Sequence, residues 1–172
     1  LLHDIELIFK GGTCLLLLTT PPRRFSIDID IITEANPAEI EAALDNMIAN
    51  SPFTRWKSDN DRKRVIDAPV GHYKLYYESQ IDQHYGEEPI LLDILYTANP
   101  YLAIQSVEIA HEWLQIEGKL LKVKVPVLEA ILGDKLTAFA PNTTGILYSK
   151  NRPTEIIKQL YDLAFLFDLS KD

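Results

Sequence analysis

The sequence has 172 residues, of which 47% are hydrophobic and 24% charged, with a formal net charge of −8. A chain of this size and composition buries a core of its own, and its apolar run at 15–18 is far too short to span a membrane. The acidic balance argues against binding of bulk DNA. The single cysteine, Cys14, excludes an internal disulfide and fits a reducing compartment, and the sequence shows no signal peptide, so we expect a cytoplasmic protein.

The first predicted elements are a strand over residues 6–9, the glycine turn Gly11-Gly12 and a helix over 14–20. We expect Thr13 to cap this helix, because threonine hydroxyls accept hydrogen bonds from backbone amides at helix starts. Pro21-Pro22 then ends the helix, since proline cannot continue it.

The next element is a predicted strand over 25–31, in which Asp28 and Asp30 alternate with isoleucines. Alternation places both carboxylates on one strand face, about 7 Å apart along the strand. Two acids on one face repel each other unless water, a hydrogen bond or a cation compensates. Following a Gly-Gly-Thr turn, the pair indicates either a solvated strand face or a metal held beside bound phosphates.

A helix is predicted over 37–50, with Asn36 as its N-cap and Pro37 in its first turn. Its apolar residues recur at helical spacing: Ile40, Leu44, Met47 and Ile48. The order strand, helix, strand, helix predicts an α/β layered fold.

The segment 55–64 holds five basic residues in ten, with Asp and Asn at its centre. Asp and Asn favour turns, so a hairpin tip is expected there. Its basic side chains indicate either a solvated loop or one that faces phosphate or RNA. The remaining predicted elements are strands over 63–68, 72–79, 89–96 and 120–125, a helix of about 14 residues opened by Pro126, and a helix from Pro153 to Asp168, with 101–117 ambiguous.

Asp93 is the only polar residue in the apolar strand 90–96. An isolated buried carboxylate costs several kcal/mol unless it is paired, protonated or bound to a cation. One interpretation is a hydrogen bond to the backbone or an arginine. The other is that strand 89–96 lies beside strand 25–31, so that three carboxylates converge on one or two Mg²⁺ ions.

Two charged residues on the last helices are harder to place. Lys135 falls at the centre of an apolar helix stripe, where it either extends its charged end to water or reaches a triphosphate across a cleft. Asp162 lies on the polar side of a helix whose predicted apolar face is Ile156, Leu160, Leu163, Ala164 and Phe167, so periodicity predicts that it is on the surface. Histidines 3, 72, 84 and 111 lack ligand spacing, so we expect no zinc.

Four motifs in order resemble the AbiEii-type nucleotidyltransferases, the toxin family of type IV toxin–antitoxin systems within the DNA polymerase β-like superfamily. These are Lys10-Gly-Gly-Thr13, Arg24-Phe-Ser-Ile-Asp-Ile-Asp30, Gly133-Asp-Lys-Leu-Thr-Ala138 and Glu155-Ile-Ile-Lys-Gln-Leu-Tyr-Asp-Leu163. Together they span most of the chain.

The resemblance implies a catalytic Mg²⁺ or Mn²⁺ bound by Asp28 and Asp30, with Asp93 as third carboxylate or base. It also implies a set of nucleotide-binding residues: Lys10, Gly11, Gly12, Thr13, Ser26, Lys135 and Asp162. The implied reaction moves an NMP group from an NTP to an RNA 3′ end, such as that of tRNA, or to a protein hydroxyl, and the implied partner is a cognate antitoxin.

Two departures from the family pattern are Gln159, where an Asp is frequent, and Lys158, where an Arg is frequent. They leave open a catalytically inactive member that binds nucleotide or protein. A phosphohydrolase with a similar carboxylate cluster fits the motif order less well.

The expected fold is an α/β (α+β) nucleotidyltransferase fold, a mixed twisted sheet flanked by helices with a C-terminal helical part. We expect a core over 1–97 and a strand with helices over 98–172 packing on it. The apolar start, Leu1-Leu2-His3, suggests that an N-terminal helix is missing from the sequence.

Overall fold

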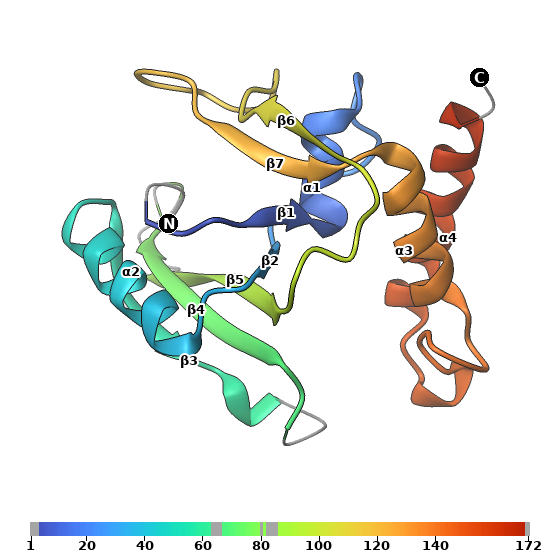
Figure 1. Ribbon diagram of the computed structural model, residues 1–172, viewed down its shortest axis with the longest axis horizontal. Coiled ribbons are helices and arrows are strands. Elements are labelled where there is room, and N and C mark those ends of the chain that lie inside the picture. Colours follow the sequence, from blue (N-terminus) through green and yellow to red (C-terminus); the bar gives the residue numbers. More distant parts are fainter. Residues whose placement is uncertain (1–3, 63–66, 80, 82–85, 171–172) are drawn as a thin grey trace. The chain divides into compact units, whose positions relative to one another are not determined.

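The computed structural model describes residues 4–62, 67–79, 81 and 86–170 (Figure 1). Its strands are β1 (Ile8–Lys10), β2 (Ile29–Thr33), β3 (Phe53–Ser58), β4 (Val70–Glu78), β5 (Glu87–Tyr96), β6 (Ile104–Glu108) and β7 (Lys122–Pro126). Its helices are α1 (Gly11–Leu18), α2 (Pro37–Ala49), α3 (Leu128–Phe139) and α4 (Pro153–Leu169), with short 3₁₀ turns η1 (Asn60–Arg62) and η2 (Tyr148–Lys150).

The strands form one mixed sheet in the order β3-β4-β5-β2-β1-β7-β6. β4 pairs antiparallel with β3 and β5, β2 pairs parallel with β5, and β1 pairs antiparallel with β2 and parallel with β7. The predicted mixed sheet with flanking helices is therefore confirmed.

The chain forms two compact units. The first comprises Leu1–Pro100 and Ser106–Val125, and the second comprises Tyr101–Gln105 and Pro126–Asp172. The first unit contains α1, α2 and the strands from β1 to β5, and the second contains α3 and α4.

The sheet of the first unit is covered on one face by α2, which lies beside β3 (Figure 1). Along β4, Tyr73 and Leu75 are buried, whereas His72 and Lys74 on the opposite face are partly exposed. This alternation is typical of a sheet with one face in the core. Burial raises the pKa of the Tyr73 phenol, whose hydroxyl lies 3.2 Å from that of Tyr96.

The second helix confirms the sequence prediction most fully. The Asn36 side chain accepts a hydrogen bond from the backbone amide of Glu39, and the Glu39 carboxylate accepts one from the backbone amide of Asn36. Together the two bonds form a complete capping box. Ile40 and Leu44 are fully buried. In turn, Asp45 accepts a hydrogen bond from the Trp56 indole on β3 at 2.8 Å.

Several predicted boundaries were wrong. Thr13 does not cap α1, which starts at Gly11, three residues before the predicted start, with Lys10 as its N-cap residue. The predicted strand 25–31 begins only at Ile29, and Pro126 ends β7 rather than opening α3. Of the predicted strand 63–68, residues 63–66 lie outside the described residues, and β4 begins after it. The ambiguous stretch 101–117 contains β6.

The other predicted elements agree with the structure apart from shifts of a few residues at their ends. Strand 89–96 lies within β5, strand 72–79 overlaps β4, and the final helix matches α4. Within the described part of the chain, every helix is too short or too polar to cross a bilayer.

Candidate active site

Four chemically active residues form a row across four neighbouring strands of the first unit. The strand register pairs Lys10 of β1 with Asp30 of β2, Asp30 with Asp93 of β5, and Asp93 with His72 of β4. Directly paired residues present their side chains on the same face of a sheet. The row therefore places two carboxylates in the middle and a nitrogen base at each end.

The Asp30–Asp93 pair is the predicted juxtaposition of two distant carboxylates. The two residues are 63 positions apart in the chain, yet they lie opposite each other because β2 and β5 are parallel neighbours. Neighbouring strands are about 4.8 Å apart, so the carboxylates lie close enough to repel each other in water-poor surroundings. A cation or a hydrogen-bond donor between or beside them would relieve that repulsion.

His72 supplies one such donor. Its Nδ1 lies 2.7 Å from Oδ1 of Asp93. A carboxylate can only accept, so the proton of this hydrogen bond is on Nδ1. The side chains are 18% and 32% exposed, respectively, so the pair is partly shielded and still reachable from solvent. Asp93 is thus paired with a histidine, a partner that the sequence interpretation did not include.

The glycine turn packs against the carboxylate of Asp30. A Cβ atom built on Gly11 would lie only 2.1 Å from Asp30 Oδ2, and Gly11 has a φ of +76°. Both facts favour glycine, which has no Cβ and adopts positive φ without strain. Gly11 also opens α1, so the Asp30 carboxylate lies against the first turn of that helix.

The next residues of the turn hold the segment before β2. A Cβ on Gly12 would lie 2.6 Å from Arg24 Nη2 and 3.0 Å from Ser26 Oγ, so both side chains pack against this glycine. The Thr13 hydroxyl donates a hydrogen bond to the carbonyl of Asp28. The turn therefore brings together most of the predicted nucleotide-binding residues of the first unit.

Asp28 itself lies one residue before β2 and is exposed. Within the described ranges, no group of three or more His, Cys, Asp or Glu side chains is arranged to hold a metal ion by itself. Mg²⁺ in proteins is commonly held by one or two carboxylates, with waters and substrate phosphates completing its octahedron. The hard oxygen donors of Asp30 and Asp93, side by side on one sheet face, fit that donor set.

In the second unit, Lys135 of α3 and Asp162 of α4 form an ion pair of 2.8 Å. Their side chains are 9% and 3% exposed. The prediction that Asp162 is on the surface was wrong, and Lys135 does not extend to water. Helix periodicity failed here because the two charges neutralise each other inside the α3–α4 contact.

The predicted apolar face of α4 agrees only in part with the buried one, which it shares at Leu163. Leu163 and Leu166 are buried beside Asp162, whereas Leu160 and Phe167 are about half exposed. One turn before Asp162, Gln159 has a buried Oε1 that accepts no hydrogen bond from the residues that the structure describes.

Two residues of the first unit belong with the predicted site although they were not among the predicted site residues. His72 was considered only as a metal ligand, because its pairing with Asp93 depends on strand register. Arg24 is the first residue of the Arg-Phe-Ser signature, and this position in the motif could have identified it as a site residue. Its guanidinium packs on Gly12 and donates to the carbonyl of Phe25 at 3.3 Å.

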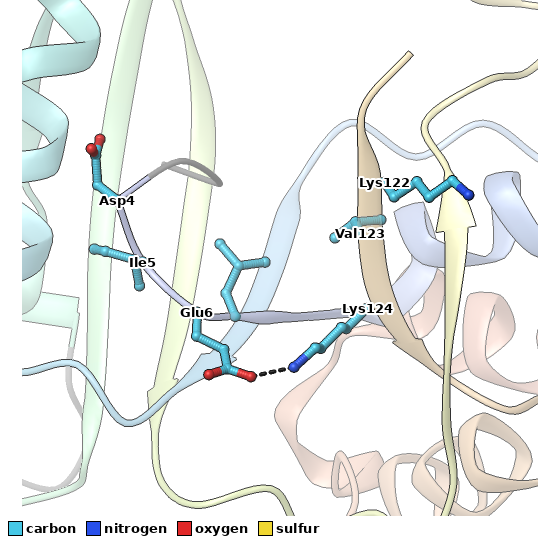
Figure 2. Close-up of a pocket in the computed structure, with 7 residues that line it drawn as sticks. Asp4, Ile5, Glu6, Lys122, Val123 and Lys124 are labelled. Carbon is cyan, nitrogen blue, oxygen red and sulfur yellow. Dashed lines mark hydrogen bonds and ion pairs between the residues drawn. The ribbon is translucent and has the colours of Figure 1, made fainter.

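A separate pocket of about 370 Å³ opens between residues 4–7 and 122–124 (Figure 2). The Glu6 carboxylate and the Lys124 ammonium form an ion pair across it, and this hydrogen bond lowers the pKa of Glu6. Its lining residues are distinct from the predicted site residues.

The fold is similar to that of solved structures. JHP933 from Helicobacter pylori matches with a TM-score of 0.60 and 20% identity, over 96% of this chain and 59% of that protein. An antigenic nucleotidyltransferase-like protein from Paracoccidioides brasiliensis matches with a TM-score of 0.54 and 13% identity, over 97% of this chain and 69% of that protein. This chain thus spans less than two thirds of the length of JHP933.

No curated protein sequence matches the chain significantly. The sequence profile of one family, described as nucleotidyl transferase AbiEii toxin of type IV toxin–antitoxin systems, matches residues 2–172. That match covers nearly the whole sequence and agrees with the order of motifs and the fold. The chain belongs to the AbiEii nucleotidyl transferase toxin family.

Proposed function

We propose that this protein is a nucleotidyltransferase that moves an NMP group from an NTP to a hydroxyl acceptor, with its catalytic centre on the sheet face that carries Asp30 and Asp93. The observation that carries the proposal is their direct pairing on parallel neighbouring strands, with Gly11 of the glycine turn against Asp30. The family membership supports the same reaction class.

Asp30 and Asp93 are the residues that would hold a divalent cation, Mg²⁺ or Mn²⁺, while the metal-binding role of Asp28 stays a prediction. When bound, such an ion neutralises phosphate charge and helps to orient the attacking oxygen. The two paired carboxylates provide oxygen donors, and phosphate oxygens of the NTP supply further ones. Asp93 is also the candidate to accept the proton of the attacking hydroxyl, since it is partly exposed.

The glycine turn is the proposed phosphate-binding element. Gly11, Gly12 and Thr13 form the first turn of α1, where unpaired amides and the helix dipole favour anions. Arg24 beside Gly12 adds a guanidinium suited to phosphate oxygens. Lys10 and Ser26 complete the proposed set, while the nucleotide-binding roles of Lys135 and Asp162 stay predictions.

Among acceptors, RNA fits the sheet face better than a protein hydroxyl. Register places Lys57 beside Lys74, on the same face as His72 and Asp93, and the Arg55 guanidinium stacks 3.6 Å from the ring centre of Tyr76. Basic and aromatic side chains on an open sheet face are typical of single-stranded RNA recognition. Lys74 and Arg55 are also paired with Asp59 and Glu87, so the local charge is moderate.

The biological setting proposed is that of a toxin in the reducing cytoplasm, held in check by a cognate antitoxin protein, as the type IV family implies. Cys14 is the single cysteine and is buried, so the fold does not depend on an internal disulfide, which suits that compartment. The alternative is an inactive member that binds nucleotide without turnover, favoured by the neutral Gln159 one turn from Asp162.

The test uses purified protein with Mg²⁺, each α-labelled NTP in turn, and total RNA or a protein extract as acceptor. We expect labelled RNA with wild type and a loss of about a hundredfold or more with Asp30→Asn, which keeps the shape but weakens metal binding. Glu34→Gln is the matched control, because Glu34 is an exposed carboxylate just beyond the other end of β2.

Equal labelling by wild type and Asp30→Asn with all NTPs would refute the proposed catalytic centre. Labelled protein in place of RNA would keep the reaction class and change the acceptor. Nucleotide binding without transfer to either acceptor would favour the inactive member.

A further inference from the structure

The backbone of His72 is held by two hydrogen bonds although its side chain is partly exposed. Its amide donates to Asn60 Oδ1 at 2.9 Å, and its carbonyl accepts from the Asp59 amide at 2.7 Å. Both backbone groups therefore point away from β5. His72 and Asp93 thus form the non-hydrogen-bonded type of antiparallel pair, in which facing side chains approach most closely.

The surroundings fix the strand around this histidine. Asp59 is anchored by an ion pair of 3.1 Å with Lys74, two residues after His72. On the opposite face of β4, a Cβ on Gly71 would lie 2.7 Å from the Tyr96 hydroxyl, and Tyr73 is buried. The strand therefore has little room to shift, and the 2.7 Å contact with Asp93 Oδ1 gives the imidazole Nδ1 a defined position.

A donor in a defined position at one carboxylate oxygen has a specific chemical consequence. The Nδ1 hydrogen bond to Oδ1 selects one orientation of the Asp93 carboxylate. Metal-binding carboxylates are commonly oriented in this way by an outer-sphere partner, and removing that partner weakens metal binding. The opposite neighbour of Asp93 in the row is Asp30, so the same hydrogen bond helps to set how the two carboxylates face each other.

We propose that His72 is a positioning residue that orients the Asp93 carboxylate for binding a divalent cation together with Asp30. This inference rests on the proposed function, because it assumes that the two carboxylates share a cation. His72 acts through Asp93 and does not itself contact the metal or the substrate. A purely structural role would instead make the pair one more cross-strand contact that supports β4 on β5.

The two roles differ in what a conservative replacement rescues. An asparagine places its amide nitrogen close to the position of the imidazole Nδ1, so His72→Asn retains a donor to Asp93. His72→Leu keeps similar volume and removes the donor. If His72 positions Asp93, His72→Asn should retain cation binding and His72→Leu should lose it. If His72 only packs between the strands, leucine should be the better replacement.

The experiment measures Mn²⁺ binding to the full chain by the loss of the electron paramagnetic resonance signal of free Mn²⁺. We expect His72→Leu to weaken Mn²⁺ binding about 10- to 100-fold, in line with outer-sphere partners elsewhere. His72→Asn should stay near wild type, and Asp93→Asn should bind most weakly. Glu88→Gln is the control, since it alters a carboxylate on β5 about 17 Å along the strand from Asp93.

The outcomes separate the two proposals. If Asp93→Asn weakens Mn²⁺ binding while His72→Leu matches wild type, the positioning role is overturned and the metal site stands. If His72→Asn is as weak as His72→Leu, positioning by this hydrogen bond is likewise overturned. If wild type binds no Mn²⁺, the metal site itself fails, and this inference fails with it. Should leucine prevent folding, His72→Gln offers the same comparison, because its amide lies beyond the Nδ1 position.

Discussion

The carboxylates of Asp93 and Asp162 each have a basic partner at nearly the same distance, yet their surroundings are opposite. Asp93 lies 2.7 Å from His72 on a partly exposed sheet face of the first unit. Asp162 lies 2.8 Å from Lys135 in the interior of the α3–α4 contact of the second unit. One pair can accept a ligand from solvent, whereas the other is enclosed by its own helices.

The comparison shows what burial does to an acid–base pair. A buried pair has lost its water, so each charge depends on the other, and removing one leaves an uncompensated charge. A partly exposed pair keeps water as a substitute partner, so it contributes little to stability. The same kind of contact therefore serves the fold in the second unit and leaves Asp93 available for chemistry in the first.

The largest expected effect is on the enclosed pair. Lys135→Met should lower the free energy of unfolding by about 3–5 kcal/mol, because it leaves the Asp162 carboxylate buried without its cation. Urea denaturation followed by circular dichroism measures the change. The double variant Lys135→Met/Asp162→Leu should recover most of the loss, since neither charge remains. A single variant as stable as wild type would contradict the burial of this pair.

A smaller loss of stability is expected at the glycine turn, which borders the sheet face that carries His72 and Asp93. Gly11→Ala should cost about 1–3 kcal/mol from its positive φ. It should also reduce transfer activity, because the new Cβ collides with the Asp30 carboxylate. Gly118→Ala is the matched control: its φ is +84°, but a Cβ there meets no described atom within 4 Å. Equal transfer activity of Gly11→Ala and Gly118→Ala would show that the contact of the glycine turn with Asp30 does not matter for the reaction.

The smallest effect on stability is expected from Asp93→Asn. Because the His72–Asp93 pair is partly exposed and water can replace this contact, the loss should stay within about 1 kcal/mol. Asp162→Asn, measured side by side, should lose several times more, since that site is closed to water. Similar losses of stability for Asp93→Asn and Asp162→Asn would contradict the proposed difference between the partly exposed pair and the buried pair. Thermal unfolding of the two variants at one pH supplies the measurement.

Local sequence signals predicted the elements they control. The N-cap at Asn36 depends on neighbouring residues, and the structure contains it as predicted, with Glu39 completing a capping box. The alternation of Ile29, Asp30 and Ile31 lies within β2. The start of α1 was misplaced because Thr13 uses its hydroxyl for the distant carbonyl of Asp28. A local rule cannot anticipate a partner fifteen residues away.

The sequence by itself determined which acids stand out: an Asp-x-Asp after a glycine turn, and one Asp in an apolar strand. Periodicity and composition reveal such exceptions because they are properties of neighbouring residues. Only the tertiary structure decided which of them meet. Strand order set Asp93 between Asp30 and His72, and helix packing buried Asp162 against Lys135. Both arrangements depend on contacts between residues far apart in the chain, which no local pattern encodes.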